Sequence, residues 1–324
     1  MIDPRREAFE RVGGRYDVRV LEPSPPAVHE PPWFADDPVA PEPRLPGRAL
    51  VSPVANGDRT WDDVAREEAD LTEWCADRWL GAWRRLPPLR STDALVTTKE
   101  SWHVLAEHVL SAARRAANGK IGLRYTRGGV GTPFYAIGDD ERQARLEGDE
   151  LVVVRDGTER RAPITTVAAA ADLVGVTPGA PADLYTPATV GEPETTLVVD
   201  ANAARVLGDW FGFACSVLEE LRVEAGGRDR RTQVWPEHFD ISIDLGDEAA
   251  GTRGTFGASP GDAEHPVPYL YVTHWAGLPD APFWNDHAFS GASLAYTTLL
   301  DVDDQRRAAL DFYLTGVTLL SGRA

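Results

Sequence analysis

The chain of 324 residues contains very little cysteine. The two cysteines, Cys75 and Cys215, offer no second pair and no C-x-x-C spacing, so the sequence predicts neither a zinc site nor a redox motif. Each lies in a segment that reads as an apolar helix, and a reducing compartment disfavours a disulfide between them. We therefore expect two buried free thiols.

Long apolar runs are also lacking. Residues 1–17 are rich in arginine and glutamate and contain no apolar stretch of about 7–15 residues, which a secretory signal requires. Nothing later in the chain approaches the roughly 20 apolar residues of a transmembrane helix. The sequence therefore predicts a cytoplasmic protein without a membrane partner.

Positive charge is scarce, with 33 lysines and arginines against 51 aspartates and glutamates and a net charge of −18. Because clustered basic residues hold phosphate backbones, we expect no nucleic-acid partner. The charge is also uneven. Residues 232–304 contain Arg253 as their single basic residue, whereas residues 111–130 are basic and contain no acid. Such asymmetry can bias a cleft toward ligands of one sign.

Proline is concentrated near the N-terminus, over residues 1–60. Proline lacks the backbone N–H donor and fixes φ, so we predict an extended arm there, anchored at Trp33 and Phe34. One alternative is that the arm is a proline-rich ligand for a partner domain, which would make the protein an interaction module.

The rest of the chain shows helical and strand-like periodicities. Helices are predicted over 61–86, 98–117, 165–173, from Asp200 to 221, and over 304–320. Strands are predicted over 120–125, 132–137, 143–147, 151–155, 233–245, 252–258, 268–274 and 292–300. Strands that follow one another without helices favour antiparallel sheets covered by helices, so we predict an α+β fold.

The order helix, strands, helix occurs twice, which suggests two halves. We expect four parts. They are a proline-rich extended arm over 1–60, a helical segment with a first α+β half over 61–180, a Pro/Gly-rich linker over 181–199, and a second α+β half over 200–324 that carries the candidate site.

Several familiar motifs are missing. The glycine-rich stretch Arg127–Thr132 lacks the spacing of a phosphate-binding loop, and we interpret it as a hairpin loop. His103 and His108 share a predicted helix but are about 140° apart around it, so they cannot act as a metal-binding pair. No serine-hydrolase elbow, zinc-protease or protein-kinase signature is present.

The informative segment is Trp235–Gly246, with the sequence WPEHFDISIDLG. Its apolar residues alternate with a polar set, so a strand there would be half-buried and would present one polar face. The polar set consists of His238, Asp240, Ser242 and Asp244.

Two further histidines follow, His265 and His274. A predicted turn over Ser259–Asp262 would direct His265 back toward the neighbouring strands. Two histidines and a carboxylate can bind a divalent metal with open positions, although the spacing here is loose. The alternative is a strand face that is merely solvated.

This region also resembles a family of bacterial proteins of unknown function. The resemblance is carried by WPEHFDISIDLG, by FGASPGD-x-x-HP-x-PYLYV over 256–272, and by a segment from Pro282 to Ala292. It spans about residues 98–320 and implies a grouping without a mechanism. It directs attention to His238, Asp240, Asp262 and His265.

The sequence therefore leads to three hypotheses of function. The first is a small-ligand-binding or accessory protein with a polar site beside the C-terminal sheet, with His238, Asp240, Asp262, His265 and His274 as candidates. The second is a metal-dependent hydrolase that uses His238, Asp240 and His265, with Glu237 or Asp262 as base. The third is the interaction module described above. The sequence identifies no cofactor, although a divalent metal is possible.

Overall fold

The structure is a computed structural model that describes residues 55–56, 59–60, 85–126, 128–133, 135–137, 140–155, 158–226, 232–277 and 280–322. The predicted arm lies outside these residues except for two short strands, β1 (Ala55–Asn56) and β2 (Arg59–Thr60), which pair with each other. The predicted helix over 61–86, with Cys75, also lies outside them apart from its last two residues.

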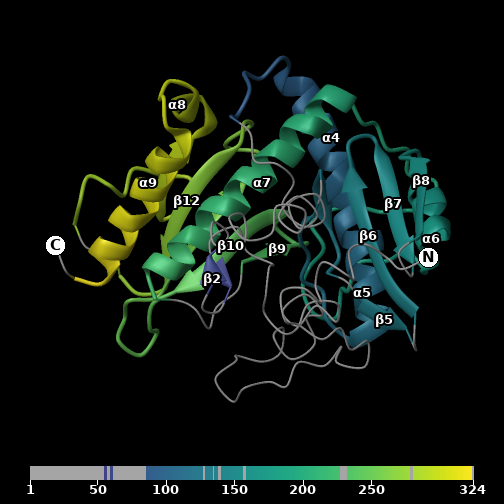
Figure 1. The fold of residues 1–324 in the computed structure, drawn as a ribbon, viewed down its shortest axis with the longest axis horizontal. Coiled ribbons are helices and arrows are strands. Elements are labelled where there is room, and N and C mark those ends of the chain that lie inside the picture. The colour runs from purple at the N-terminus through teal and green to yellow at the C-terminus, as the bar shows by residue number, and fades with distance from the viewer. Residues whose placement is uncertain are drawn as a thin grey trace.

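Two larger antiparallel sheets form the frame (Figure 1). The C-terminal sheet contains, in chain order, β9 (Gln233–Trp235), β10 (Asp240–Leu245), β11 (Gly254–Ser259), β12 (Tyr269–His274) and β13 (Gly291–Ala295). The N-terminal sheet contains β3 (Arg124–Thr126), β4 (Gly129–Gly131), β6 (Asp140–Glu147), β7 (Glu150–Arg155) and β8 (Thr158–Pro163), with β5 (Tyr135–Ile137) paired to β6. This confirms the predicted α+β fold with antiparallel sheets.

The helix predicted from residue 98 begins earlier, at Thr92, whereas the predicted cap Asp200 and the predicted stop at Gly119 are confirmed. The described helices are α4 (Thr92–Leu105), the π-helical segment η2 (Ala106–Leu110), α5 (Ser111–Asn118), α6 (Val167–Val174), α7 (Ala201–Glu224), α8 (Tyr296–Leu300) and α9 (Gln305–Leu320). The predicted cap Asp200 accepts a hydrogen bond from the Ala203 amide at 2.9 Å. Gly119, with φ of 80°, ends α5 in the left-handed conformation.

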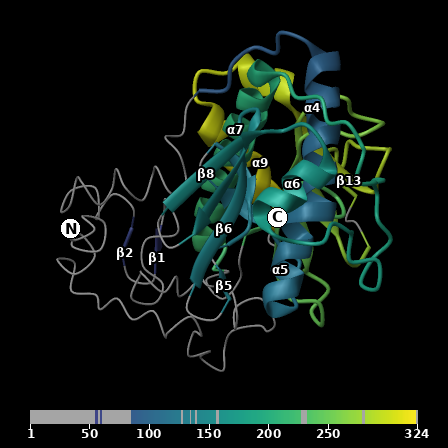
Figure 2. The ribbon, with the colours of Figure 1, turned by 90° about the vertical axis from the view of Figure 1, so that its right-hand side faces the viewer.

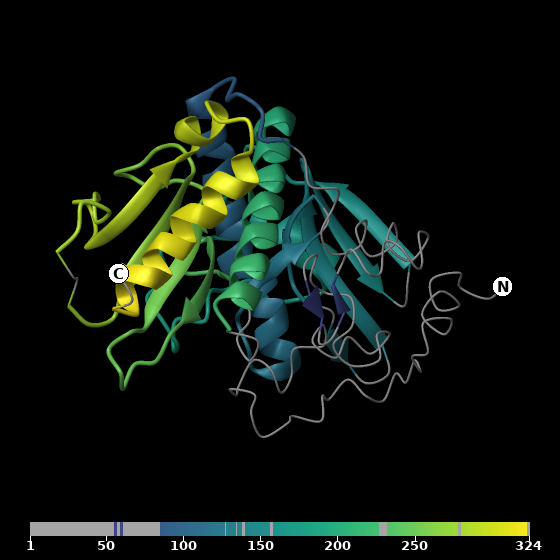
Figure 3. The same cartoon turned by 60° about the vertical axis from the view of Figure 1, so that its left-hand side comes forward.

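Helix α7 lies between the two sheets, and α9 runs beside it across the C-terminal sheet (Figure 3). The consecutive helical segments α4, η2 and α5 lie beside the N-terminal sheet, with α6 nearby (Figure 2). The sheets meet at one isolated bridge, where Leu123 and Val234 exchange backbone hydrogen bonds of 2.8 and 2.9 Å. The first strand of each sheet therefore lies next to that of the other.

The core is continuous around α7. Trp210, Phe211 and Phe213 are fully buried on this helix, and full burial of such a side chain contributes roughly 2–3 kcal/mol. The Trp210 indole donates a hydrogen bond to the Ser259 carbonyl at 2.9 Å. Tyr313 of α9 donates to the Gly257 carbonyl at 2.8 Å. Both helices are thus tied to β11, and together they cover one face of the C-terminal sheet.

The structure corrects several predicted elements. The segment 233–245 is a hairpin of β9 and β10, because Pro236 begins a turn. The segment 292–300 is a strand only to Ala295 and then becomes α8. The sequence analysis missed β8, since its residues are mostly exposed and charged. Of the glycine-rich stretch, Gly129–Gly131 is strand β4 of a β3–β4 hairpin. The division into an arm, two halves and a linker stays a prediction.

We predict that Gly208→Ala destabilises the protein, although alanine is the better helix former by about 1 kcal/mol. A Cβ atom at Gly208 would overlap the backbone carbonyl of Gly128, so α7 would have to move away from the N-terminal sheet. We expect a loss of ~2 kcal/mol or more in the free energy of unfolding, measured by urea denaturation.

The matched control is Gly316→Ala in α9. There the atoms nearest to the added Cβ would be side-chain atoms of Val272, at 3.1 Å, and of Phe256, at 3.3 Å. We expect a change within about 1 kcal/mol, because the gain in helix propensity offsets mild crowding. Equal effects of the two substitutions would contradict the close approach of α7.

Candidate functional site

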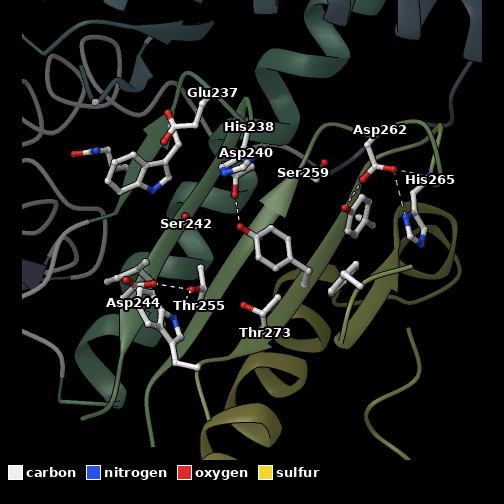
Figure 4. A pocket seen from close by; sticks show the side chains of 18 of the residues that line it. Glu237, His238, Asp240, Ser242, Asp244, Thr255, Ser259, Asp262, His265 and Thr273 are labelled. Atoms are coloured by element: carbon white, nitrogen blue, oxygen red, sulfur yellow. Dashed lines mark hydrogen bonds and ion pairs between the residues drawn. The ribbon is translucent and has the colours of Figure 1, made fainter. Parts of the chain in front are cut away.

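The face of the C-terminal sheet that points away from α7 and α9 forms a wall of a cavity of about 990 Å³ (Figure 4). Successive side chains of a strand point to opposite faces, so alternate residues of β10, β11 and β12 face this cavity. The residues between them are buried in the core. The alternating set that lines the cavity consists of Asp240, Ser242, Asp244, Thr255, Ser259, Tyr269, Tyr271 and Thr273.

The sheet register brings Tyr271 of β12 to Asp240 of β10. Gly257 of β11 lies between these strands, and it pairs with both Ser242 and Tyr271. A side chain at Gly257 would overlap the Tyr271 ring, so only glycine lets the ring lie across β11. The Tyr271 hydroxyl then donates a hydrogen bond to Oδ2 of Asp240, drawn as a dashed line in Figure 4.

Asp240 is only 6% exposed, and its Oδ1 atom has no hydrogen-bond partner among the described residues. Burial raises the pKa of Asp240 to about 6, although the Tyr271 hydrogen bond and the neighbouring His238 act in the opposite direction. The pKa of Tyr271 is raised well above its usual value by burial and by the Asp240 charge. A half-satisfied buried carboxyl thus lies in the wall of the cavity.

The turn between β9 and β10 carries Glu237 and His238 to the same cavity. Phe239 ends the turn with φ of 52°, a conformation that is unusual for a bulky residue. Its buried ring stacks on His103, with ring centroids 5.2 Å apart, and packs edge-on against Phe211. The aromatic contacts hold the strained turn in place, and His103 has this structural role.

Glu237 resembles Asp240 in its electrostatics. Burial raises the pKa of the Glu237 carboxyl, and the nearby Glu107 adds to the effect. Its own backbone N–H and His238 lower that pKa in part. The Oε2 atom of Glu237 also has no hydrogen-bond partner within the described part of the chain.

At the other end of the cavity the carboxylates are satisfied. Asp262 Oδ2 accepts from the Tyr269 hydroxyl at 2.5 Å, and Oδ1 accepts from the amides of Glu264 and His265 at 2.9 and 2.7 Å. Burial alone would raise the pKa of Asp262, but these hydrogen bonds more than offset it and hold that pKa below its usual range. His265 Nε2 lies 3.0 Å from Oδ2 of Asp286. His265 and Asp262 therefore fasten the loop after β11.

The basic residue Arg253 is held by three neighbouring side chains. It pairs with Asp244 and with Glu248, both at 2.7 Å, and its guanidinium lies 3.8 Å above the Trp275 ring. Thr255 donates a second hydrogen bond to Asp244 at 2.7 Å. Asp244 faces the same cavity as Asp240, but both of its oxygens have partners.

The structure brings four of the five residues proposed from the sequence to one cavity: His238, Asp240, Asp262 and His265. His274 does not line it, because strand alternation places it on the other side of β12 from Thr273, and its ring instead contacts Trp284. The sequence analysis missed the aromatic lining, whose signal was the spacing of Tyr269 and Tyr271 two residues apart. It also missed Asp286, which comes from a distant loop.

A metal centre does not fit this arrangement. Across the described residues, no group of three or more histidine, cysteine, aspartate or glutamate side chains is placed to hold a metal ion. His265 contacts Asp286 through Nε2 and lies beside Asp262, whose oxygens accept other hydrogen bonds. The geometry therefore gives the metal-dependent hypothesis no support.

Comparison with known proteins yields no match: no family model, no curated protein and no solved structure is significantly similar to this chain. The resemblance to a bacterial family stays a prediction. Among the described helices, none has the length and apolar character needed to cross a bilayer.

We predict that Asp240→Asn stabilises the protein at high pH. The pKa of Asp240, about 6 in the folded state, lies above the unfolded value of about 3.9, so protonation favours folding. The stabilisation that protonated Asp240 provides is fully present below about pH 4 and is lost as the pH rises through 6. Asparagine cannot ionise, and we expect a gain on the order of 1–3 kcal/mol at pH 8 that shrinks toward pH 4, measured by urea denaturation. Glu237, His238 and Tyr271 act on the pKa of Asp240, and the Asp240 charge in turn raises the pKa values of Tyr269 and Tyr313.

The matched control is Asp244→Asn, on the same strand and facing the same cavity. It weakens an ion pair with Arg253, so we expect a loss of up to about 1 kcal/mol at pH 8. Destabilisation of similar size by both substitutions would show that Asp240 is not an uncompensated carboxyl.

Proposed function

We propose that the protein binds a small organic molecule in the cavity on the open face of the C-terminal sheet, as a binding or accessory protein. The observation that supports this most strongly is the buried carboxyl of Asp240, which faces the cavity with one oxygen unpartnered. Buried polar atoms normally have partners, and an exception in a cleft is a candidate for ligand contact.

The cavity itself suits such a ligand. Its volume of about 990 Å³ lies at the upper end of the range of small-molecule sites, and it combines aromatic walls with a few convergent polar groups. The strain at Phe239 is a second supporting feature, because a backbone held in a sparsely populated conformation is typical of binding sites.

The other two hypotheses have no comparable support. The described residues offer no metal-binding group, and the proline-rich arm is outside the described part of the chain. The proposal includes a cytoplasmic setting and no nucleic-acid partner, in keeping with the net charge of −18.

We predict that Thr273→Trp abolishes ligand binding without unfolding the protein. Thr273 is half-buried on β12 and faces the cavity, so an indole there would occupy the ligand's space. Ligands are first found by a thermal-shift screen of a metabolite library that contains cationic, neutral and anionic compounds. The substitution should remove the shift of each hit while leaving the unliganded melting temperature within a few degrees.

The control is Thr158→Trp, which adds the same bulk to an exposed strand position on β8, away from the cavity. This variant should keep the full ligand-induced shift. If no compound stabilises the wild type, or if Thr273→Trp binds every hit normally, the proposed function is wrong.

A further inference from the structure

The charge lining the cavity is predominantly negative. Five carboxylates line it, against three lysine and arginine side chains. The carboxylates are Glu237, Asp240, Asp244, Asp262 and Glu264, and the basic residues are Arg114, Lys120 and Arg253.

Two of the basic side chains in the cavity, Arg114 and Arg253, already donate to protein acceptors, whereas two carboxylate oxygens lack a partner. Arg253 is held by two carboxylates, and buried Arg114 donates to the Gly122 carbonyl. In contrast, Asp240 Oδ1 and Glu237 Oε2 are buried and have no partner among the described residues. A ligand that satisfies these atoms must donate hydrogen bonds, and one with a positive charge would also neutralise them.

Aromatic side chains flank the half-satisfied carboxyl of Asp240 on both sides. Trp235 pairs directly with Asp240 across β9 and β10, so the two side chains share the cavity face. On the other side Tyr271 crosses β11 to donate to Asp240. A carboxylate between aromatic rings is a typical setting for an organic cation, because the ring faces attract positive charge as well.

We infer that the cavity is selective for an organic cation, a ligand with an ammonium or guanidinium group that pairs with Asp240 between Trp235 and Tyr271. The inference rests on the proposed function and adds the ligand class to it. A neutral polyol could also donate to Asp240, but it would leave the buried negative charge without a counter-charge, which is costly.

The experiment compares four compounds at pH 8 by isothermal titration calorimetry on the full chain. Two are cations, 1,4-diaminobutane and the guanidinium probe agmatine, and the others are the neutral 1,4-butanediol and the anion succinate. We expect a cation to bind at least 30-fold more tightly than the diol, and succinate not to bind. Equal or weaker binding of both cations would overturn the inference.

Variants then separate Asp240 from the general charge of the cavity. Asp240→Asn and Asp244→Asn each remove one negative charge from the same strand, so their long-range effects on a cation are similar. We expect Asp240→Asn to weaken cation binding at least tenfold and Asp244→Asn to weaken it less than threefold, since Asp240, unlike Asp244, has an unpartnered oxygen. Equal losses would overturn the role of Asp240.

The aromatic contribution has its own test. Trp235→Phe should retain most of the cation affinity and Trp235→Leu should lose at least fivefold, whereas equal affinities would remove Trp235 from the inference.

The library screen separates a failure of the cation inference from a failure of the proposed binding function. Hits that are all neutral or anionic and are blocked by Thr273→Trp would overturn the cation inference and leave the proposed function standing, whereas the absence of any hit would end both.

Discussion

The structure depends on the burial of α7 between two antiparallel sheets. The helix is buried along most of its length, and at Gly208 it approaches the β3–β4 hairpin so closely that no side chain fits. Trp210 anchors the same helix to β11 of the other sheet. Because α7 and α9 together cover one face of the C-terminal sheet, the opposite face of that sheet is left to form the cavity.

Buried carboxylates elsewhere in the molecule show how such groups are normally accommodated. Glu107, on the π-helical segment η2, is fully buried, but it accepts hydrogen bonds from the amides of Ala188 and Thr189 and from the Thr189 hydroxyl, at 3.0, 2.8 and 2.5 Å. Asp286 accepts from the Ala288 amide at 3.0 Å and faces His265. Both carboxylates stabilise loops, and each has several partners. Asp240 differs from them in the one property that matters for binding, an oxygen left free.

The same contrast holds within one strand. Asp240 and Asp244 are four residues apart on β10 and face the same cavity, yet Arg253 and Thr255 engage Asp244 completely. The difference arises in the neighbouring strand. Thr255 lies opposite Asp244 and donates a hydrogen bond to it directly. Gly257, in the middle of β11, has no side chain, so Tyr271 can cross β11 and approach Asp240 from one side. A glycine therefore shapes the cavity as much as the polar residues do.

The local periodicity of the sequence determined the α+β class, the caps at Asp200 and Gly119, and the alternation that separates Asp240 and Asp244 from the buried Ile241 and Ile243. These features depend on residues that are neighbours in the chain, where helical and strand spacing act directly. Such patterns also indicated His238, Asp240, Asp262 and His265, which line one cavity.

The sequence could not determine the contacts between distant segments of the chain. Tyr271 contacts Asp240, Asp286 contacts His265, and Phe239 contacts His103, and the partners lie 31, 21 and 136 positions apart in the chain. Sheet register and helix packing decide such contacts, and a one-residue change in register would move every side chain of a strand to the other face. The tertiary structure alone therefore decided which carboxylates of the cavity wall are satisfied and which, such as Asp240, keep an unpartnered oxygen.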